Sequence, residues 1–356
     1  MQKLPRAGAL AILAALSAAI VWSAFSVQPI DTSADTPSAA LEVQGPDDTQ
    51  KGDLALYRRI SERVASGESY YAAAVAEQEA SNYPTRPFVT VRQPTLAWMQ
   101  SVIGIDGVRY FAMGLLAACL AAFWLRFAYG LSLVERAGSL LLAAIGGIAA
   151  TIPVAGLVHE IIAGLLLTFA FLAYDPKRYW PSLLAAALAI AIREISVPFV
   201  ALWLAYSLAQ NRWREAVGVG AILALFALGM YGHFLGVEAH TSPGGPQSQG
   251  WEALAGYSLP IAALLKLTFL QAIPPIIAAP LAILPLIGWL GLGGRAGLFA
   301  TLWCVGHFTA LALFARPENF YWVQLVLPAY LIGLAFAPRA LLDLFGRAFS
   351  SPSSPK

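Results

Sequence analysis

Long apolar stretches recur along the whole 356-residue sequence, and they constrain the fold more than any other feature. Hydrophobic residues make up 58% of the chain and charged residues 12%, whereas a soluble domain has about 25% charged residues. Too few polar groups remain to cover a water-exposed surface, so membrane lipids must solvate most of the chain. The net charge of +2 does not favour a nucleic-acid partner, which requires a strongly basic face. The sequence therefore predicts an all-α polytopic membrane protein.

A transmembrane helix needs about 20 mostly apolar residues, and about ten stretches approach that length. The expected spans are 8–27, 109–128, 137–155, 157–174, 180–196, 197–210, 216–235, 274–293, 297–315 and 320–337. We expect residues 1–356 to form a single membrane domain. The first stretch also has features of a cleaved secretory signal, but its apolar run is long for one. Both interpretations place the following segment on the same side of the membrane.

The basic residues that flank these stretches predict the orientation. Lysine and arginine are enriched in cytoplasmic loops. With ten spans, the following flanking residues all fall on one side: Lys3, Arg6, Arg126, Arg136, Lys177, Arg178, Arg212, Arg214, Arg295, Arg339, Arg347 and Lys356. That side is therefore cytoplasmic, and both termini lie there.

Two hydrophilic segments lie on the opposite, non-cytoplasmic side. The larger covers 28–107 and is expected to form short amphipathic helices at 53–66, 69–80 and 95–103. Such helices would lie along the membrane surface and cover the ends of the spans. The second outer loop with its surface helix covers 236–273, and its part 258–272 is the apolar helical segment.

Charged and polar residues gather at the outer ends of the predicted spans. A charge inside lipid costs at least about 2.5–3.5 kcal/mol on insertion scales, so each one needs an explanation. The residues that share the outer side are Asp53, Arg92, His159, Glu160, Arg193, Glu194, Lys266, Arg316, Asn319 and Tyr321. This one-sided convergence beneath a helical loop predicts a functional site.

Several of these residues also have purely structural interpretations. Glu160 and Arg193 would form a buried pair, Asp53 would be the N-cap of a loop helix, and Arg316 would flank a span. Tyr321 would anchor the helix at the membrane interface. His307 lies mid-span and is expected to be a hydrogen-bonded core residue. The two cysteines lie in apolar runs and are expected to be free, buried residues.

The sequence contains no recognisable metal or nucleotide motif. There is no HExxH, no pair of histidines four residues apart, no cysteine cluster and no phosphate-binding P-loop. We therefore expect no cofactor and assign no metal ligand, while dependence on a divalent metal stays open. A bound phosphate would have to be held by arginine or lysine side chains.

The first outer loop resembles that of the GT-C superfamily of polyprenyl-phosphate-dependent glycosyltransferases. The matching stretches read KGDLALYRRISERVASGESYY and NYPTRPFVTVRQPTLAWMQSVIG. Asp53 and Tyr57 match the acid and tyrosine that open this loop, and Arg92-x-Pro94 through Trp98 matches its end. The late outer segment ARPENFYWVQLVLPAY is similar to another junction of the family.

This resemblance implies transfer of a sugar from a polyprenyl-phosphate donor on the periplasmic face of a bacterial inner membrane. Asp53 would be the general base that activates an acceptor hydroxyl, with inversion at the sugar. The residues that would bind the lipid phosphate are Arg92, Arg193, Lys266 and Arg316. The residues that would contact or orient the sugar are Tyr57, His159, Glu160, Glu194, Asn319 and Tyr321. The acceptor is left as a glycan, a lipid or a protein.

Two other classes of function fit a polytopic chain with polar residues. A transporter or lipid flippase would place charges along a path to both faces, whereas here they lie mainly at one. A non-catalytic membrane subunit would use the outer loop to bind a partner, and a transferase that has lost its activity would have the same sequence pattern.

Overall fold

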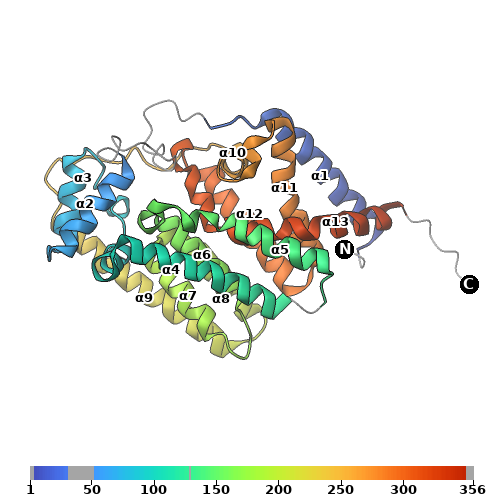
Figure 1. The fold of residues 1–356 in the computed structure, drawn as a ribbon, viewed down its shortest axis with the longest axis horizontal. Helices are drawn as coiled ribbons and strands as arrows, with labels where there is room; N and C mark the ends of the chain where they lie inside the picture. The colour runs from blue at the N-terminus through green and yellow to red at the C-terminus, as the bar shows by residue number, and fades with distance from the viewer. Residues whose placement is uncertain (1–3, 31–51, 128–129, 350–356) are drawn as a thin grey trace, which may run out of the picture. The chain divides into compact units, whose positions relative to one another are not determined.

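The computed structural model describes residues 4–30, 52–127 and 130–349, and its regular elements in these ranges are helices. The predicted all-α fold is therefore confirmed for the described part of the chain. The chain divides into two compact units (Figure 1). The terminal unit comprises Met1–Ile30, Phe127–Gly146 and Ala253–Lys356, and the loop unit comprises Asp31–Arg126 and Gly147–Glu252. Residues 31–51 of the predicted outer loop lie outside the described residues.

The terminal unit is built from apolar helices that approach each other closely at small residues. Its elements are α1 (Arg6–Ser26), α5 (Leu133–Gly146), α10 (Ser258–Lys266), η6 (Phe269–Ala272), α11 (Pro275–Leu292), α12 (Gly294–Phe314), η7 (Pro317–Leu325) and α13 (Leu327–Phe349). A Cβ added at Gly288 in α11 would lie 1.7 Å from the carbonyl oxygen of Gly333 in α13. Only glycine permits this crossing, which is how membrane helices pack when backbones must meet.

The loop unit carries the predicted first outer loop and five further α-helices. Its elements are α2 (Asp53–Ala65), α3 (Tyr70–Ala80), η2 (Phe88–Thr90), α4 (Thr95–Phe127), η3 (Ile148–Thr151), η4 (Pro153–Leu157), α6 (His159–Leu172), α7 (Trp180–Ile192), η5 (Glu194–Ser196), α8 (Val197–Ala209) and α9 (Trp213–Glu238). Helix α4 breaks at Gly104, where φ is 75°. A residue without a Cβ adopts this conformation readily, so the predicted short helix at 95–103 is present and turns into the following span.

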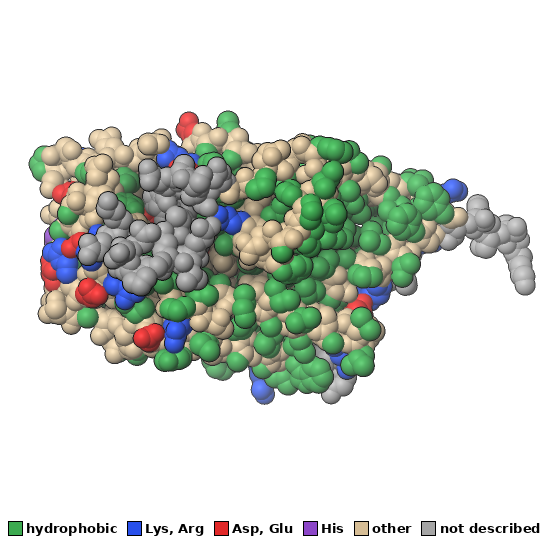
Figure 2. Space-filling view, turned by 45° about the horizontal axis from the view of Figure 1, so that its top comes forward, with side chains coloured by type: hydrophobic (Ala, Val, Ile, Leu, Met, Phe, Trp, Pro, Cys, Tyr) green, Lys and Arg blue, Asp and Glu red, His purple; other side chains and the backbone are tan. Residues whose placement is uncertain are grey.

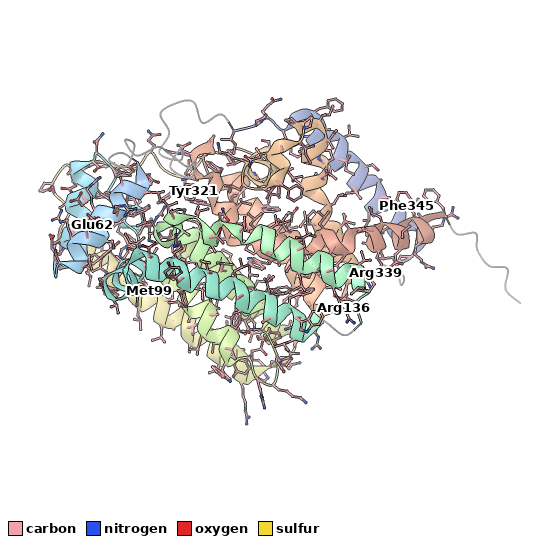
Figure 3. The ribbon with its side chains drawn as sticks, viewed as in Figure 1. Glu62, Met99, Arg136, Tyr321, Arg339 and Phe345 are labelled. Atoms are coloured by element: carbon pink, nitrogen blue, oxygen red, sulfur yellow. The ribbon has the colours of Figure 1, made fainter. Side chains whose placement is uncertain are left out.

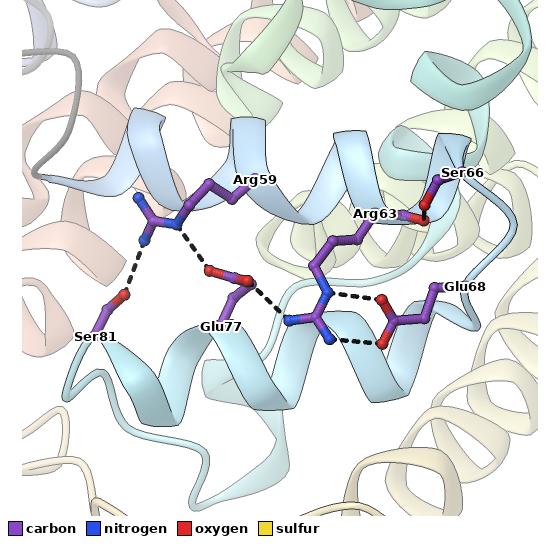
Figure 4. A network of polar contacts seen from close by, with 6 residues as sticks. All are labelled: Arg59, Arg63, Ser66, Glu68, Glu77 and Ser81. Atoms are coloured by element: carbon purple, nitrogen blue, oxygen red, sulfur yellow. Dashed lines mark hydrogen bonds and ion pairs between the residues drawn. The ribbon is translucent and has the colours of Figure 1, made fainter.

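Helices α2 and α3 form an antiparallel pair outside the spans. Leu56, Ile60 and Val64 recur on one face of α2 and are buried in a common apolar cluster with residues of α3. Ion pairs join the solvent-facing sides: Arg63 contacts Glu68 at 2.6 Å and Glu77 at 2.8 Å, as Figure 4 shows. The helices expected at 53–66 and 69–80 are thus confirmed, because their apolar spacing is local information.

Six helices in the described ranges are long and apolar enough to cross a membrane. They are Arg6–Ser26, Phe88–Arg126, Trp213–Glu238, Pro275–Leu292, Gly294–Phe314 and Leu327–Phe349. The other four expected spans correspond to α5, α6, α7 and α8, which have only 13 or 14 residues each. The chain is therefore a multi-pass membrane protein, and the count of ten stays a prediction. Figure 2 shows largely hydrophobic side chains over the long helices, with charged ones around α2 and α3.

Two predicted span boundaries differ from the structure. The stretch 137–155 is helical only to Gly146 and continues as the 3₁₀ turns η3 and η4. A Cβ at Gly146 would lie 2.8 Å from the Cα of Pro328, so the helix end is set by a close tertiary contact. The stretch 320–337 begins as the 3₁₀ helix η7, and α13 then extends to Phe349.

Candidate active site

The first residue of α2, Asp53, carries the carboxylate of the candidate site. The N-cap of this helix is Gly52, with φ at 96°, and no side chain caps the first turn. The oxygen Oδ1 of Asp53 is buried and has no hydrogen-bond partner among the described residues. The structural interpretation of Asp53 as an N-cap is therefore wrong, because its carboxylate does not bind the free N–H groups of the helix.

The surroundings of Asp53 make its carboxyl a better proton acceptor. Burial raises its pKa above the ordinary value, since a low-dielectric environment disfavours the charged form. A hydrogen bond from Tyr83 and the positive charge of Arg92 lower this pKa, whereas the negative charge of Glu160 raises it. The net direction is upward, as expected for a group that takes up a proton near neutral pH.

Tyr57 lies one turn after Asp53 on α2 and links the helix to two other segments. Its hydroxyl accepts a hydrogen bond from Nε of Arg92 at 3.0 Å. Its ring packs edge-on against the imidazole of His159, with centroids 5.0 Å apart. The hydroxyl of Tyr70 donates to the carbonyl of Arg92 at 2.5 Å. The segment that carries Arg92 is thus held by both loop helices.

A buried chain of charges continues from Arg92 toward α6 and α7. Oε1 of Glu160 lies 4.0 Å from Nη2 of Arg92 and accepts a 2.6 Å hydrogen bond from Nε of Arg193. Nη1 of Arg193 also contacts Oε1 of Glu194. The side chain of Arg193 is only 1% exposed. The pair of Glu160 and Arg193 that the sequence suggested is therefore present, and Glu194 completes it.

Helix ends place these charges. Glu160 lies in the first turn of α6, and Arg193 is the C-cap residue of α7 with an extended backbone. An acid at a helix N-terminus and a base at a helix C-terminus are both stabilised by the helix dipole. The 3₁₀ turn η4 comes just before α6, and the 3₁₀ turn η5 comes just after α7. The local sequence thus delivers opposite charges to adjacent helix ends.

A small pocket lies beside this cluster. Its cavity volume is about 10 Å³, and it is lined by Tyr57, Ile60, Tyr70, Gln78, Arg92, Gln93, Ala97, Gln100 and His159. The buried amides of Gln93 and Gln100 donate to the carbonyls of Ile190 and Gly156 at 2.9 and 2.7 Å. These bonds tie the start of α4 to the ends of α7 and η4.

The remaining predicted site residues belong to the terminal unit. Lys266 ends α10, and its Nζ lies 5.2 Å from the ring centroid of Phe320. Arg316 is the N-cap of η7, and its backbone N–H donates to Oδ1 of Asn319 at 3.3 Å. Tyr321 follows on η7, beside Phe320 (Figure 3). Asn319 thus has a structural role as a helix cap, and the group is described within its own unit.

The sequence interpretation missed several residues of the site. Tyr83, Gln93 and Gln100 contact the candidate base or fix its neighbours, but no motif marks them. The only sequence signal for Gln93 and Gln100 is that they lie in or beside the amphipathic stretch 95–103. Two predictions outside the candidate site are confirmed. His307 is a hydrogen-bonded core residue, with its Nε2 2.9 Å from the carbonyl oxygen of Trp322, and both cysteines are free and buried. Among the described residues, no three His, Cys, Asp or Glu side chains are grouped to hold a metal.

Comparison of the fold with solved structures supports the GT-C resemblance of the first outer loop, whereas comparison of the sequence finds no match. No protein-family model matches the chain, and no curated protein matches it either. Solved structures do match over almost the whole chain, and they have the GT-C fold. The chain is therefore a helical membrane protein with the fold of the GT-C superfamily.

Two of the matching solved structures are of ArnT from Cupriavidus metallidurans. The structure of ArnT bound to undecaprenyl phosphate matches with a TM-score of 0.51 and 15% identity, over 94% of this chain. The apo structure of ArnT matches with a TM-score of 0.52 and 14% identity, over 95% of this chain. The chain spans 61% and 62% of those ArnT chains, about three fifths of their length.

Proposed function

We propose that the chain is a membrane-embedded glycosyltransferase that moves a sugar from a polyprenyl-phosphate donor to an acceptor hydroxyl on the periplasmic face of a bacterial inner membrane. The observation that carries the proposal is the half-buried carboxylate of Asp53, which lies near Arg92 and its buried ion pairs. One oxygen of this carboxylate has no hydrogen-bond partner among the described residues. The GT-C fold supports it, since ArnT with this fold binds undecaprenyl phosphate. The acceptor would be a glycan, a lipid or a protein.

In the proposed reaction, Asp53 takes the proton of the acceptor hydroxyl. The hydroxyl oxygen attacks the anomeric carbon, and the bond between that carbon and the donor phosphate breaks. Its electron pair leaves with the polyprenyl phosphate, and the configuration at the sugar inverts. The raised pKa of Asp53 favours this proton transfer.

The leaving phosphate requires cations, and the structure separates the candidates. Arg92 has a side chain 15% exposed and lines the pocket, so we assign it to the phosphate. Lys266 and Arg316 belong to the terminal unit, and their role toward a phosphate stays a prediction. Arg193 was expected to share it, but two carboxylates enclose its guanidinium. We therefore assign Arg193 to positioning Glu160 and Glu194.

The sugar would meet aromatic and hydrogen-bonding groups. Tyr57 and His159 present adjacent rings at the pocket, and apolar sugar faces pack on such surfaces. Tyr321 belongs to the terminal unit, and its role toward a sugar stays a prediction. Glu194, with a side chain 21% exposed, would accept a hydrogen bond from a sugar hydroxyl.

The test is a transfer assay with undecaprenyl-phosphate-linked pentoses and hexoses, following the release of undecaprenyl phosphate by the purified protein. Asp53→Asn is expected to lower kcat by about 10²–10⁴-fold, the usual contribution of a general base. The matched control is Asp106→Asn, since Asp106 is an exposed acid that pairs with Arg109 at 3.7 Å. Full activity of a folded Asp53→Asn variant would remove Asp53 from the mechanism. If neither the wild type nor any variant transfers a sugar and the protein translocates lipid instead, the flippase alternative would be favoured.

A further inference from the structure

Glu160 holds two arginines with a single buried oxygen. Its Oε1 accepts from Nε of Arg193 at 2.6 Å and lies 4.0 Å from Nη2 of Arg92. The side chain of Glu160 is only 4% exposed. Since a buried carboxylate is strongly destabilising without a cation, this pairing keeps both the acid and the arginines in one arrangement.

The contacts continue from Arg92 to the helix that carries the candidate base. Nε of Arg92 donates to the hydroxyl of Tyr57 at 3.0 Å, and its Cζ lies 6.0 Å from the centroid of that ring. Tyr57 and Asp53 are four residues apart on α2, so they lie on the same face one turn apart. Arg92 therefore connects Glu160 to α2.

We propose that Glu160 is a positioning residue for the candidate base, and that it acts by fixing the guanidinium of Arg92 against the first turn of α2. This inference rests on the proposed function for its catalytic meaning. Its physical content, a carboxylate on α6 that controls the charge around Asp53 through Arg92, holds without it.

The charged groups around Asp53 define the expected effect. Tyr83 comes from the segment after α3, Arg92 from the segment before α4, and Glu160 from α6, and each of them acts on the proton affinity of Asp53. Next to them lie His159 on α6, the C-cap Arg193 of α7, and Glu194 on η5. Of Glu160 and Glu194, Glu160 is the carboxylate whose negative charge raises the pKa of Asp53.

Glu160→Gln keeps a hydrogen-bond acceptor for Arg193 but removes the negative charge. The repulsion that favours protonated Asp53 disappears. Arg92 stays beside α2 through its hydrogen bond to Tyr57, and its positive charge is no longer balanced by Glu160. Both changes lower the pKa of Asp53. The midpoint of its titration should fall by about one pH unit, the size expected for a nearby unit charge in a partly buried site.

The experiment is an infrared titration of the purified full chain. The carboxylic-acid band of Asp53 is identified as the band lost in Asp53→Asn, and its midpoint is measured in each variant. Glu160→Gln should shift the midpoint downward. Glu194→Gln is the matched control, because it also removes a carboxylate from Arg193 and should shift the midpoint much less. An unchanged midpoint in Glu160→Gln, or equal shifts in both variants, would overturn the proposal.

A double variant separates positioning from a direct charge effect. Arg92→Gln alone should raise the midpoint, because it removes the cation next to Asp53. If Glu160 acts by holding Arg92, the shift caused by Glu160→Gln should shrink in the Arg92→Gln background. A shift of unchanged size would show that Glu160 acts on Asp53 only directly, and would overturn the positioning role.

Two further arms keep the result interpretable. If Glu160→Gln does not fold, Glu160→Asp takes its place. The shorter side chain keeps the negative charge but moves it away from Arg92, so the midpoint should move in the same direction by less. An unchanged midpoint in Glu160→Asp would count against the proposal. If the wild-type chain transfers no sugar but the midpoints move as expected, the proposed function fails and the positioning role stands. If it does transfer sugar, the acid limb of kcat/KM should move with the midpoint.

Discussion

At the scale of single residues, the position of a carboxylate decides its role. Asp53 begins a helix, where the sequence also allowed an N-cap. The structure shows that it caps no N–H group and that one of its oxygens is buried without a partner among the described residues. Such an arrangement is unfavourable for folding, and unfavourable groups are retained at functional sites more often than elsewhere.

This cost predicts that Asp53→Asn stabilises the protein in a pH-dependent way. The pKa of Asp53 in the folded state is raised above the ordinary value of 3.8, so the folded state binds the proton more tightly than the unfolded state. The stability contributed by this proton is fully present below pH 3.8 and is lost as pH rises through the folded pKa. The melting temperature of Asp53→Asn in detergent should therefore exceed that of wild type by about 2 °C at neutral pH, and the gain should vanish in acid. A gain that does not change with pH would contradict this reasoning.

Of the site residues, the sequence identified Asp53, Tyr57, Arg92, Glu160 and Arg193, which the structure brings together in the loop unit. Its resemblance to a family implied a role for each of them, but it could not show that Arg193 is enclosed by two acids. Whether an arginine faces a ligand or is enclosed by acids depends on which helix ends meet, and spacing along the chain does not contain that information.

At the scale of elements, locally encoded helices were predicted well. Helix α2 follows from the spacing of Leu56, Ile60 and Val64 and ends just before Gly67. The end of α5 at Gly146 was not predicted, because it depends on the close approach of Pro328. Local pattern therefore determines that a helix forms, while a distant contact can decide where it ends.

The crossing of α11 and α13 predicts a sharp contrast between two glycines. In Gly288→Ala, the new Cβ would overlap the carbonyl oxygen of Gly333, so the helices must separate. We expect a loss of about 1–3 kcal/mol, typical of overpacking, measured as a lower melting temperature. Gly306→Ala in α12 is the control, since nothing lies within 4 Å of its added Cβ. Equal melting temperatures for the two variants would mean that the crossing tolerates a methyl group.

At the scale of the whole molecule, the basic residues predict how the chain is oriented in the membrane. The distribution of basic residues predicts that α2 and α3 lie outside and that the segment between α6 and α7 lies in the cytoplasm. Each unit has its own close-packed interior, for example the apolar cluster beneath α2 and α3 and the crossing of α11 with α13. Helix packing of this kind is the same whichever way the chain is inserted.

Cysteine labelling tests this orientation. The native Cys119 and Cys304 are both fully buried, so they should not react. Glu62 is exposed on α2 (Figure 3), and Arg178 is exposed between α6 and α7. A membrane-impermeant maleimide should label Glu62→Cys in cells with an intact inner membrane, and Arg178→Cys only after that membrane is opened. The reverse pattern would invert the predicted topology.

The sequence by itself determined that this chain is an all-α membrane protein with helices in its first outer loop. Composition and periodicity are properties of short stretches, and lipid accepts only elements that satisfy their own backbone hydrogen bonds. The tertiary structure confirmed the GT-C fold that the loop sequence resembles. It alone decided the enclosure of Arg193 by two acids and the link from Glu160 through Arg92 to α2. Each of these depends on which helix ends meet, and residues far apart in the sequence control that through packing.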